Sequence, residues 1–598
     1  MMNEYLSPGV YVEDAPSKPI FPSFGNVVGA MAGITQRGPI GKAVFINSWD
    51  AYLREFAQGV PSPFMANSDL AYSVWGYFQN GGKGLNVTRV ASPSAAKAKL
   101  KAGAFAPALT ISVVDGTTPV ITPEENQNLE VNLIVNTLDG LETIGASPIN
   151  PEVTYKWGYV GDFTTVLATT PTYTVQTTDL TETLMVTVTY QGQTIVWEAA
   201  GVTGTTPPVI EPEISVPPVM EAQDEGAWGN GIKILSVENE DQVGTYNVTI
   251  YVGEDPVESY QALGNTPGMR NYWIDVFEFS EVVTGISGSL TTTPALKVGS
   301  AEVPNFAKFE GGIDGIEDIT DDDYILALSS FDKIDDITLL ALPGQTSLNI
   351  TYEILDYVEK RENDLFAILD APRTAMVNDV RILKKQLKSK SAGLFYPWIR
   401  VADPLSKVGT LREVPLAGYV MGVYARIMTE RGVWKAPAGT EANIKGALEV
   451  VTQVDTADTD RLNPVGVISI FPKTNYGIVI WGARSISDDL TKFYVSDIIL
   501  NIMIKKYVFN ISQPFVFEPN NQRTWTRVET EIGAFLDSLW RAGGLFGSSA
   551  AEAYFVRCDG DLNPPESRAQ GKLIVEVGYA SSKPAEFVII RINHDKPV

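Results

Sequence analysis

Three consecutive carboxylates in TDDDY, residues 320–324, are the residues of this chain that most invite a metal-binding interpretation. Carboxylate oxygens are the ligands that hard divalent cations prefer. The same letters also fit the start of a helix, with Thr320 as N-cap and Asp323 three residues later, because the helix dipole favours acidic side chains in the first turn. We expect the helix start, with a metal site as the alternative.

Two glycine-rich stretches and one strand end could belong to an enzyme. NGGKG at 80–84 and GNG at 229–231 lack the GK[ST] ending and the spacing of a phosphate-binding loop, so they predict turns. Asp370 in LDAP, 369–372, ends a buried strand, where α/β enzymes often hold catalytic groups. No partner base or nucleophile can be placed opposite it, and we expect Asp370 to stabilise a turn.

The chain has one cysteine, Cys558, and one histidine, His594. One cysteine excludes a disulfide within the chain, and the two residues cannot assemble a Cys/His zinc site. Cys558 also lacks an identifiable histidine base, since His594 lies in the terminal tail. The sequence favours a protein that is not an enzyme, with no catalytic residues, no metal and no cofactor.

Composition is typical of a folded chain of several domains, with 598 residues, 44% hydrophobic and 19% charged. The formal net charge of −26 argues against nucleic-acid binding, which requires clustered lysine and arginine. The most apolar helix candidate, 498–508, is too short to span a membrane and contains Lys505 and Lys506. No signal peptide is expected, so the sequence predicts a protein made in the cytoplasm without membrane insertion.

The elements that must position any site begin with a mixed α/β segment at 25–104. A buried strand at 27–35 precedes a helix capped by Ser48, and a second helix at 70–79 precedes a strand at 85–90. This order predicts a compact βαβ-like unit.

An inserted all-β domain is expected at 105–217, where Thr, Val and Pro dominate and apolar residues alternate. VTVTYQGQTIVWEA, 186–199, is a clear hairpin. The segment holds 13 acidic residues against one basic residue, Lys156, which is nearly half of the net charge. These features predict an acidic immunoglobulin-like β-sandwich, which is either a solvated decoration of the outer surface or a binding module.

Mixed patterning resumes after the insertion. Strands that end at turns are expected at 337–344, 365–372 and 392–401, separated by helices, which predicts a largely parallel or mixed sheet covered by helices. A helix at 525–540 carries apolar residues at helical spacing. The overall expectation is a multidomain α+β or mixed α/β fold. The expected segments are an arm at 1–24, α/β at 25–104, the insertion at 105–217, a re-entry segment at 218–300, an α/β core at 301–480, a C-terminal domain at 481–580 and an arm at 581–598.

Short strand-forming segments lie near both ends of the sequence. They contain Val10, Tyr11 and Val12 at one end and Phe587, Val588, Ile589, Ile590 and Ile592 at the other. An unpaired strand exposes N–H and C=O groups that invite pairing with another chain. From the pattern alone, pairing of these strands within their own chain is the favoured interpretation.

Several blocks in order resemble the contractile tail sheath proteins of myovirus-type phage tails and related phage-tail-like particles. The blocks are SPGVYVED at 7–14, the segments 27–57 and 71–90, EGAWGNGIKI at 225–234 and, most specific, the C-terminal block at 523–593. The resemblance covers most of the chain except 105–217, where sheath proteins vary.

The resemblance implies a mechanical function. Sheath subunits stack as six-membered rings around a rigid tail tube and contract, which drives the tube through a target envelope. The implied partners are other copies of the chain, the tail tube protein, and baseplate and tail terminator proteins, in a virion tail assembled in the host bacterial cytoplasm. The resemblance also implies that the terminal arms add strands to sheets of neighbouring subunits, which reverses the interpretation of residues 10–12 and 587–592.

In this family the C-terminal domain contacts the tube. The resemblance therefore suggests tube contact through basic residues of that domain, with an ordinary solvated surface as the alternative. The candidates are Arg523, Arg527, Arg541, Lys505 and Lys506.

Two rival interpretations remain open. A non-contractile tail or baseplate component, or an adhesin, would use the inserted β-domain to bind surface carbohydrate and would form a fixed oligomer. A cytosolic α/β enzyme would need a catalytic constellation that these residues do not supply.

Overall fold

The computed structural model describes residues 27–101, 108–115, 118–119, 127–137, 140–144, 153–159, 166–176, 184–190, 193–198, 218–287, 290, 296–298, 301–303, 306–489 and 493–586. The chain forms two compact units. The first takes its residues from Met1–Ser94 and Gly315–Val598, and the second from Ala95–Asp314. No helix in these ranges is both long and apolar enough to cross a membrane.

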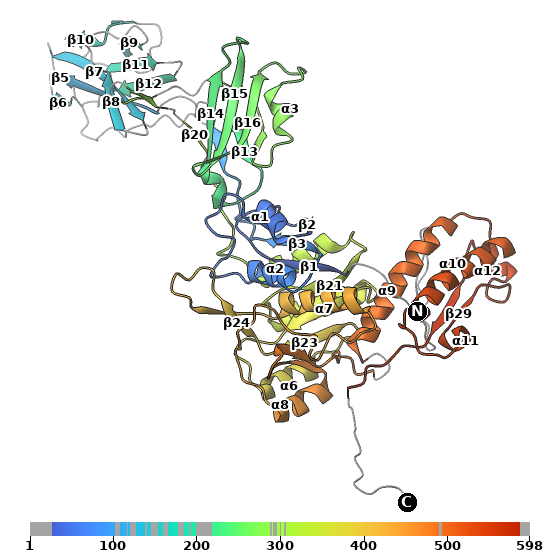
Figure 1. The fold of residues 1–598 in the computed structure, drawn as a ribbon. Helices are drawn as coiled ribbons and strands as arrows, with labels where there is room; N and C mark the ends of the chain where they lie inside the picture. Colours follow the sequence, from blue (N-terminus) through green and yellow to red (C-terminus); the bar gives the residue numbers. More distant parts are fainter. Residues whose placement is uncertain are drawn as a thin grey trace, which may run out of the picture. The chain divides into compact units, whose positions relative to one another are not determined.

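An eight-stranded sheet forms the centre of the first unit (Figure 1). Its strands in spatial order are β2 (Ala43–Ile46), β3 (Gly84–Val90), β1 (Val28–Ile34), β21 (Ile337–Ala341), β22 (Phe366–Asp370), β23 (Ala392–Tyr396), β27 (Val467–Lys473) and β28 (Gly477–Trp481). The six inner strands are parallel, and β2 and β28 add antiparallel edges. The predicted mixed α/β fold with a largely parallel sheet is confirmed.

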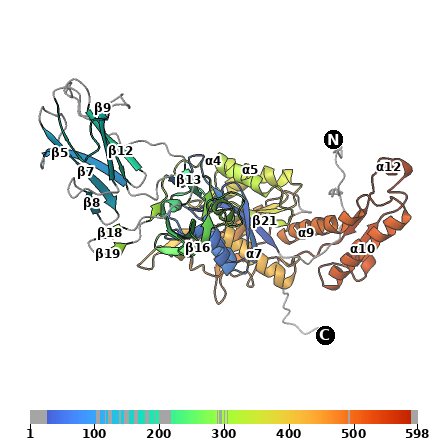
Figure 2. The same ribbon diagram turned by 90° about the horizontal axis from the view of Figure 1, so that it is seen from above.

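Helices cover both faces of this sheet, and Figure 2 shows α4 and α5 on one side and α7 on the other. One apolar cluster contains residues of α1 (Trp49–Ala57), α2 (Leu70–Gln79) and α7 (Ala417–Arg431). A second cluster contains residues of α4 (Asp321–Leu328), α5 (Leu348–Lys360), α6 (Val377–Gln386) and α8 (Thr456–Leu462). Successive strand residues serve opposite faces, so Leu339 joins the first cluster and Leu340 the second.

Local capping explains where several helices begin. The Ala51 N–H donates to Ser48 Oγ at 3.1 Å at the start of α1. The Thr320 N–H donates to the Asp323 carboxylate at 2.8 Å at the start of α4. The predicted caps at Ser48 and Thr320 are therefore confirmed, as is the predicted helix at 70–79.

The prediction of a single strand at 392–401 is wrong. The segment forms two strands in different sheets, because β24 (Ile399–Ala402) leaves the central sheet and pairs with β25 (Leu411–Val414) and β26 (Glu449–Val450). Pro397 has no N–H to extend the parallel ladder. The neighbouring Trp398 instead donates its indole N–H to the Ala371 carbonyl at 2.7 Å.

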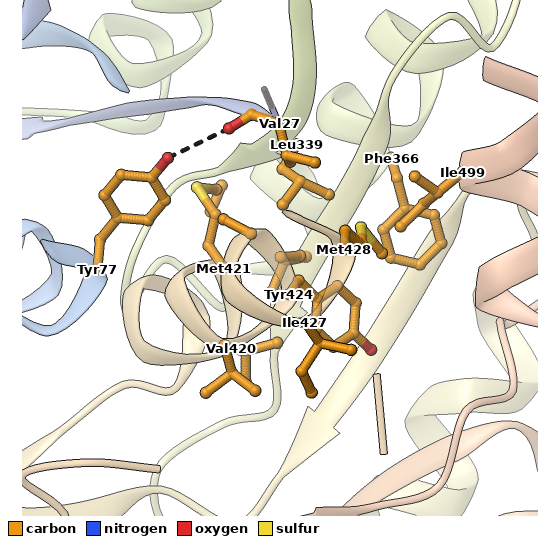
Figure 3. Packing of buried hydrophobic residues seen from close by; sticks show 14 of the residues in the cluster. Val27, Tyr77, Leu339, Phe366, Val420, Met421, Tyr424, Ile427, Met428 and Ile499 are labelled. Atoms are coloured by element: carbon orange, nitrogen blue, oxygen red, sulfur yellow. Dashed lines mark hydrogen bonds between the residues drawn. The ribbon is translucent and has the colours of Figure 1, made fainter. Parts of the chain in front are cut away.

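Helices α2 and α7 cross at very short range because glycines occupy the crossing. A Cβ at Gly418 would lie 2.2 Å from the Ser73 carbonyl oxygen, and one at Gly422 would lie 2.4 Å from the Tyr77 carbonyl oxygen. The close approach buries α7 against the sheet. Figure 3 shows part of the apolar cluster that includes α1, α2 and α7. Its packed residues include Leu339, Phe366, Met421, Met428 and Ile499.

The C-terminal region of the first unit combines helices with one small sheet. Its elements are α9 (Val495–Ser512), α10 (Gln522–Arg541), α11 (Ala550–Ala553), β29 (Tyr554–Arg557), α12 (Pro565–Ala569) and β30 (Glu576–Tyr579). The predicted amphipathic helix is α10, and its apolar stripe is buried as expected. The stripe consists of Val528, Ile532, Phe535, Leu536 and Leu539.

The second unit contains two antiparallel sheets within the predicted insertion. One sheet consists of β5 (Ala108–Asp115), β6 (Thr118–Pro119), β7 (Asn128–Thr137), β8 (Gly140–Ile144) and β10 (Thr172–Thr174). The other consists of β9 (Val153–Tyr159), β11 (Leu184–Tyr190) and β12 (Gln193–Glu198). Val131, Trp157 and Val186 share one buried cluster. The predicted hairpin is confirmed as β11–β12, and the immunoglobulin-like topology stays a prediction.

The rest of the second unit is also mainly β-structure. Its elements are β4 (Lys99–Lys101), β13 (Pro218–Ala222), β14 (Ile232–Glu238), β15 (Thr245–Val252), β16 (Asp255–Gly264), α3 (Trp273–Phe277), β17 (Val283–Gly285), β18 (Leu296–Val298), β19 (Ala301–Val303) and β20 (Ala307–Lys308). The GNG stretch lies in a short 3-10 helix, Ala227–Gly231. In the first unit, NGGKG forms the turn after α2, where Gly81 has a φ of 102°. The turn predicted for NGGKG is confirmed, whereas the turn predicted for GNG is wrong, because these residues belong to the 3-10 helix.

Candidate assembly site in the C-terminal region

Asp370, the strongest catalytic candidate, acts as a main-chain anchor. Its carboxylate accepts hydrogen bonds from the N–H groups of Gly344 at 3.1 Å, Leu416 at 2.9 Å and Ala417 at 3.0 Å. Burial raises the pKa of Asp370 to about 7, although these three bonds act in the opposite direction. The residue ties the loop after β21 and the start of α7 to the end of β22, which confirms the predicted role in stabilising a turn.

Cys558 has the environment of a structural cysteine. It is buried, and burial raises the pKa of its thiol to about 11, so the thiol is neutral at pH 7. The histidine of the chain, His594, lies outside the described residues, so the expectation that it is not a base for Cys558 stays a prediction. Across the ranges that the structure describes, no group of three or more His, Cys, Asp or Glu side chains could hold a metal ion.

An open cleft of about 710 Å³ lies near the carboxyl ends of β22 and β23. Its charged side chains are paired with one another: Arg412 with Asp69 at 3.0 Å, and Arg373 and Arg400 with Glu413 at 2.7 and 2.9 Å. The lining residues include no Ser, Thr, Cys, His or Lys that could serve as a nucleophile. The ion pairs join β24 and β25, which carry Arg400, Arg412 and Glu413, to Asp69 before α2 and Arg373 after β22.

The small sheet of the C-terminal region has two strands. β29 pairs antiparallel with β30, from Tyr554 opposite Tyr579 to Arg557 opposite Glu576. No further strand of the described residues joins this sheet. Directly after β30, the Phe546 N–H donates to the Ala580 carbonyl at 3.2 Å, and Leu545 forms a single bridge with Ser581. A strand without a second strand partner is a site where another strand can add.

The two faces of this sheet differ. Tyr554, Val556 and Val577 pack against the large apolar cluster and hold the sheet to the body. On the other face the Phe555 ring lies across Gly578, where a Cβ would come within 2.0 Å of the ring. Only glycine permits this covering of the strand. The sheet is thus a rigid two-stranded template with one anchored face.

The predicted arm residues all lie outside the described residues. They are Val10, Tyr11, Val12, Phe587, Val588, Ile589, Ile590 and Ile592. Their pairing within the chain or between chains stays a prediction.

The three arginines predicted to contact the tube lie on the exposed face of α10, opposite its buried stripe. Arg527 lies 3.8 Å from Glu531, and Arg541 bonds Asp537 at 2.6 Å. Both pairs are on the surface, where ion pairs contribute little to stability. Arg523, Arg527 and Arg541 are therefore accessible to a partner.

Lys505 and Lys506, the two lysines of α9 predicted to contact the tube, point in different directions, because neighbouring residues of a helix are about 100° apart. Lys505 makes an exposed hydrogen bond to the Glu362 carbonyl at 3.2 Å. Lys506 donates to the Ile337 carbonyl at the start of β21, and burial lowers the pKa of Lys506 to about 8. Lys505 is the better placed of the two to meet a partner.

A set of contacts after β30 was not predicted. Glu586 pairs with Arg484, 102 residues earlier, and Lys583 pairs with Asp497. No local pattern connects positions so far apart in the sequence. The charges of Lys583 and Glu586 near the predicted arm are the sequence signal that could have drawn attention to this segment.

Comparison with known proteins finds similarity to tail sheath proteins. Residues 317–486 match the phage tail sheath protein central domain. The chain is 25% identical over 265 residues to a prophage major tail sheath protein of Pseudomonas aeruginosa. The matched segment covers 43% of this chain and 64% of that protein. The predicted resemblance to contractile tail sheath proteins is therefore confirmed.

Solved structures share the fold. The sheath of an extracellular contractile injection system, the PVC sheath complex in its contracted state, matches with a TM-score of 0.50 and 20% identity over 99% of both chains. The sheath tail protein of Listeria innocua matches with a TM-score of 0.54 and 11% identity over 90% of both chains. At these identities the likeness is one of fold alone. The chain spans less than two thirds of the length of the curated relatives it matches.

Proposed function

We propose that the chain is the structural subunit of a contractile tail sheath. It polymerises as stacked six-subunit rings around a tail tube and contracts to drive the tube through a target cell envelope. The observation that supports this proposal is the match of residues 317–486 to the tail sheath central domain, in the same compact unit as a two-stranded sheet that no third described strand joins. Its role is mechanical, without catalysis or cofactor.

The proposed partners follow from this role. They are other copies of the chain, the tail tube protein, and baseplate and tail terminator proteins, in a particle tail assembled in the host bacterial cytoplasm. In this arrangement the acidic insertion at 105–217 decorates the outer surface, because its 13 acidic residues against one basic residue favour a solvated position.

Neighbouring subunits are linked through their terminal arms, 1–24 and 581–598. The β29–β30 sheet is the acceptor that we propose, since no third described strand joins it and strand addition requires a strand without a second strand partner. Each added hydrogen bond contributes about 0.5–1.5 kcal/mol net. Such links persist while the subunit bodies re-pack, so the energy difference between extended and contracted sheaths lies in the contacts between bodies.

Negative-stain electron microscopy of the purified full-length chain tests the proposal. We expect tubes or stacked rings of constant diameter and variable length. Discrete particles of fixed size would contradict the proposal and favour the rival, a baseplate component or adhesin that binds carbohydrate through the β-insertion.

Tube contact is a separate part of the proposal. We assign it to the exposed Arg523, Arg527 and Arg541 and to the half-buried Lys505. Lys506 could take part only by giving up its bond to the Ile337 carbonyl.

Charge reversal tests this assignment. Arg527→Glu with Arg541→Glu should reduce the binding of sheath to tube in a co-sedimentation assay and leave the melting temperature of the subunit nearly unchanged. Arg461→Glu on α8 is a matched control, because Arg461 is 65% exposed and also pairs within its own helix, at 3.9 Å from Asp458. Normal tube binding by the double variant would remove both arginines from the contact.

A further inference from the structure

The end of β30 and the first, described residues of the predicted C-terminal arm form a strap, here defined as residues 579–586. The strap runs along α9 in the opposite direction. The Tyr579 hydroxyl bonds Asn501, Lys583 pairs with Asp497 one helical turn earlier, and Glu586 reaches Arg484 ahead of the helix. The contacts of the strap thus advance steadily from the middle of α9 towards its N-terminus and beyond.

The last of these contacts, between Arg484 and Glu586, is the most extensive. Arg484 Nε donates to both carboxylate oxygens of Glu586, at 3.0 and 2.9 Å. A second nitrogen of Arg484 donates to the Asn463 carbonyl at 3.3 Å, and its guanidinium lies 4.9 Å from the Phe493 ring centroid. The side chains of Arg484 and Glu586 are only 14% and 12% exposed. An ion pair this sheltered is held together, because separating the charges inside the protein is unfavourable.

The position of Arg484 connects the strap to the α/β core. Arg484 lies three residues after β28, the edge strand of the eight-stranded sheet. Asn463, its second partner, directly follows α8. The strap therefore ends against the segments that directly follow β28 and α8 of the α/β core, although it starts from the small β29–β30 sheet of the C-terminal region.

We propose that the Arg484–Glu586 pair is the anchor of the C-terminal arm. It fixes where the arm leaves the body, presents the arm to a neighbouring copy of the chain in a defined direction, and passes tension from the arm into the core sheet. This inference rests on the proposed sheath function. Its physical basis is preorganisation: a tether that is already oriented loses less freedom when its strand binds.

Two measurements on the full-length chain test the anchor. Glu586→Gln keeps the shape of the side chain and removes its charge; Arg484→Met removes the other partner. Hydrogen exchange of the strap reports whether it is released, and the lowest subunit concentration that gives tubes reports assembly. The matched control is Glu441→Gln, because Glu441 pairs with Arg431 at 2.6 Å on the exposed surface of the same unit.

Both anchor variants should lose protection in the strap and raise the concentration needed for tubes about tenfold, as expected if the released arm is correctly oriented about a tenth of the time. The control should change neither quantity. Unchanged protection, or unchanged assembly by a variant whose strap is released, would overturn the anchor. Failure of the wild-type chain itself to form tubes would instead overturn the proposed function, and with it the arm-presenting role.

Discussion

Replacing Lys506 by methionine should stabilise the folded subunit near neutral pH and remove one pH-dependent contribution to its stability. Burial lowers the pKa of Lys506 from 10.5 to about 8 in the folded protein. Burial is the largest effect and lowers this pKa, as does the nearby charge of Arg361. The carboxylates of Asp364, Asp335 and Asp336 act to raise it. Between pH 8 and 10.5 the unfolded chain therefore binds a proton that the folded protein has lost.

The sign and size of the effect follow from this difference. The cost of burying the charged ammonium is fully present below pH 8 and disappears as the pH rises towards 10.5, so the wild-type protein gains stability over that window. A pKa difference of this size corresponds to about 3 kcal/mol. Methionine also forfeits the hydrogen bond to the Ile337 carbonyl, worth about 1 kcal/mol. The net gain for Lys506→Met at pH 7 is about 1–3 kcal/mol.

Urea unfolding followed by tryptophan fluorescence at pH 7, 8, 9.5 and 10.5 measures the effect. Lys505→Met is the matched control, because Lys505 is the adjacent residue on α9 and makes an exposed hydrogen bond. The difference between wild type and Lys506→Met should shrink steadily from pH 8 to 10.5. A difference that is independent of pH, or equal for the two variants, would refute the inward placement of Lys506.

Three further predictions test the fold and the role of the insertion. Gly418→Ala should destabilise the first unit by about 1–3 kcal/mol or more, because its Cβ would lie 2.2 Å from the Ser73 carbonyl oxygen. The control Gly533→Ala has open space around it on α10 and should stabilise the unit by about 0.5–1 kcal/mol. Equal melting temperatures for the two variants would contradict the tight crossing of α2 and α7. Asp370→Ala should cost about 2–4 kcal/mol in urea unfolding, since three main-chain N–H groups lose their acceptor, and a neutral effect would contradict the anchoring role. Deleting 105–217 should leave tube formation intact under the electron microscope, and a folded deletion variant that no longer assembles would show that the insertion belongs to the lattice.

Local sequence was sufficient to predict the elements whose signals are local. Ser48 caps α1 through a bond to a residue three positions away, and Asp323 reaches back to Thr320 in the same way. The apolar stripe of α10 likewise repeats within one helix. Such patterns depend on neighbours in the sequence, so they can be recognised before any tertiary contact is known.

Features that depend on distant residues could not be predicted in this way. The strand expected at 392–401 is divided because Ile399 pairs with Val414 and Val450 in another sheet. The different partners of Lys505 and Lys506 depend on where α9 packs. The Arg484–Glu586 pair and the two-stranded sheet of β29 and β30 likewise become visible only when the chain is folded.

The proposed arms depend on residues outside the described ranges, so the most direct measurement is a cryo-electron microscopy map of the assembled tubes. The account predicts an additional strand hydrogen-bonded to an outer edge of β29 or β30. That strand should be traceable to residues 10–12 or 587–592 of a neighbouring copy. Solvent-exposed edges, or arms that pair only within their own chain, would contradict the proposal that strand exchange links the subunits.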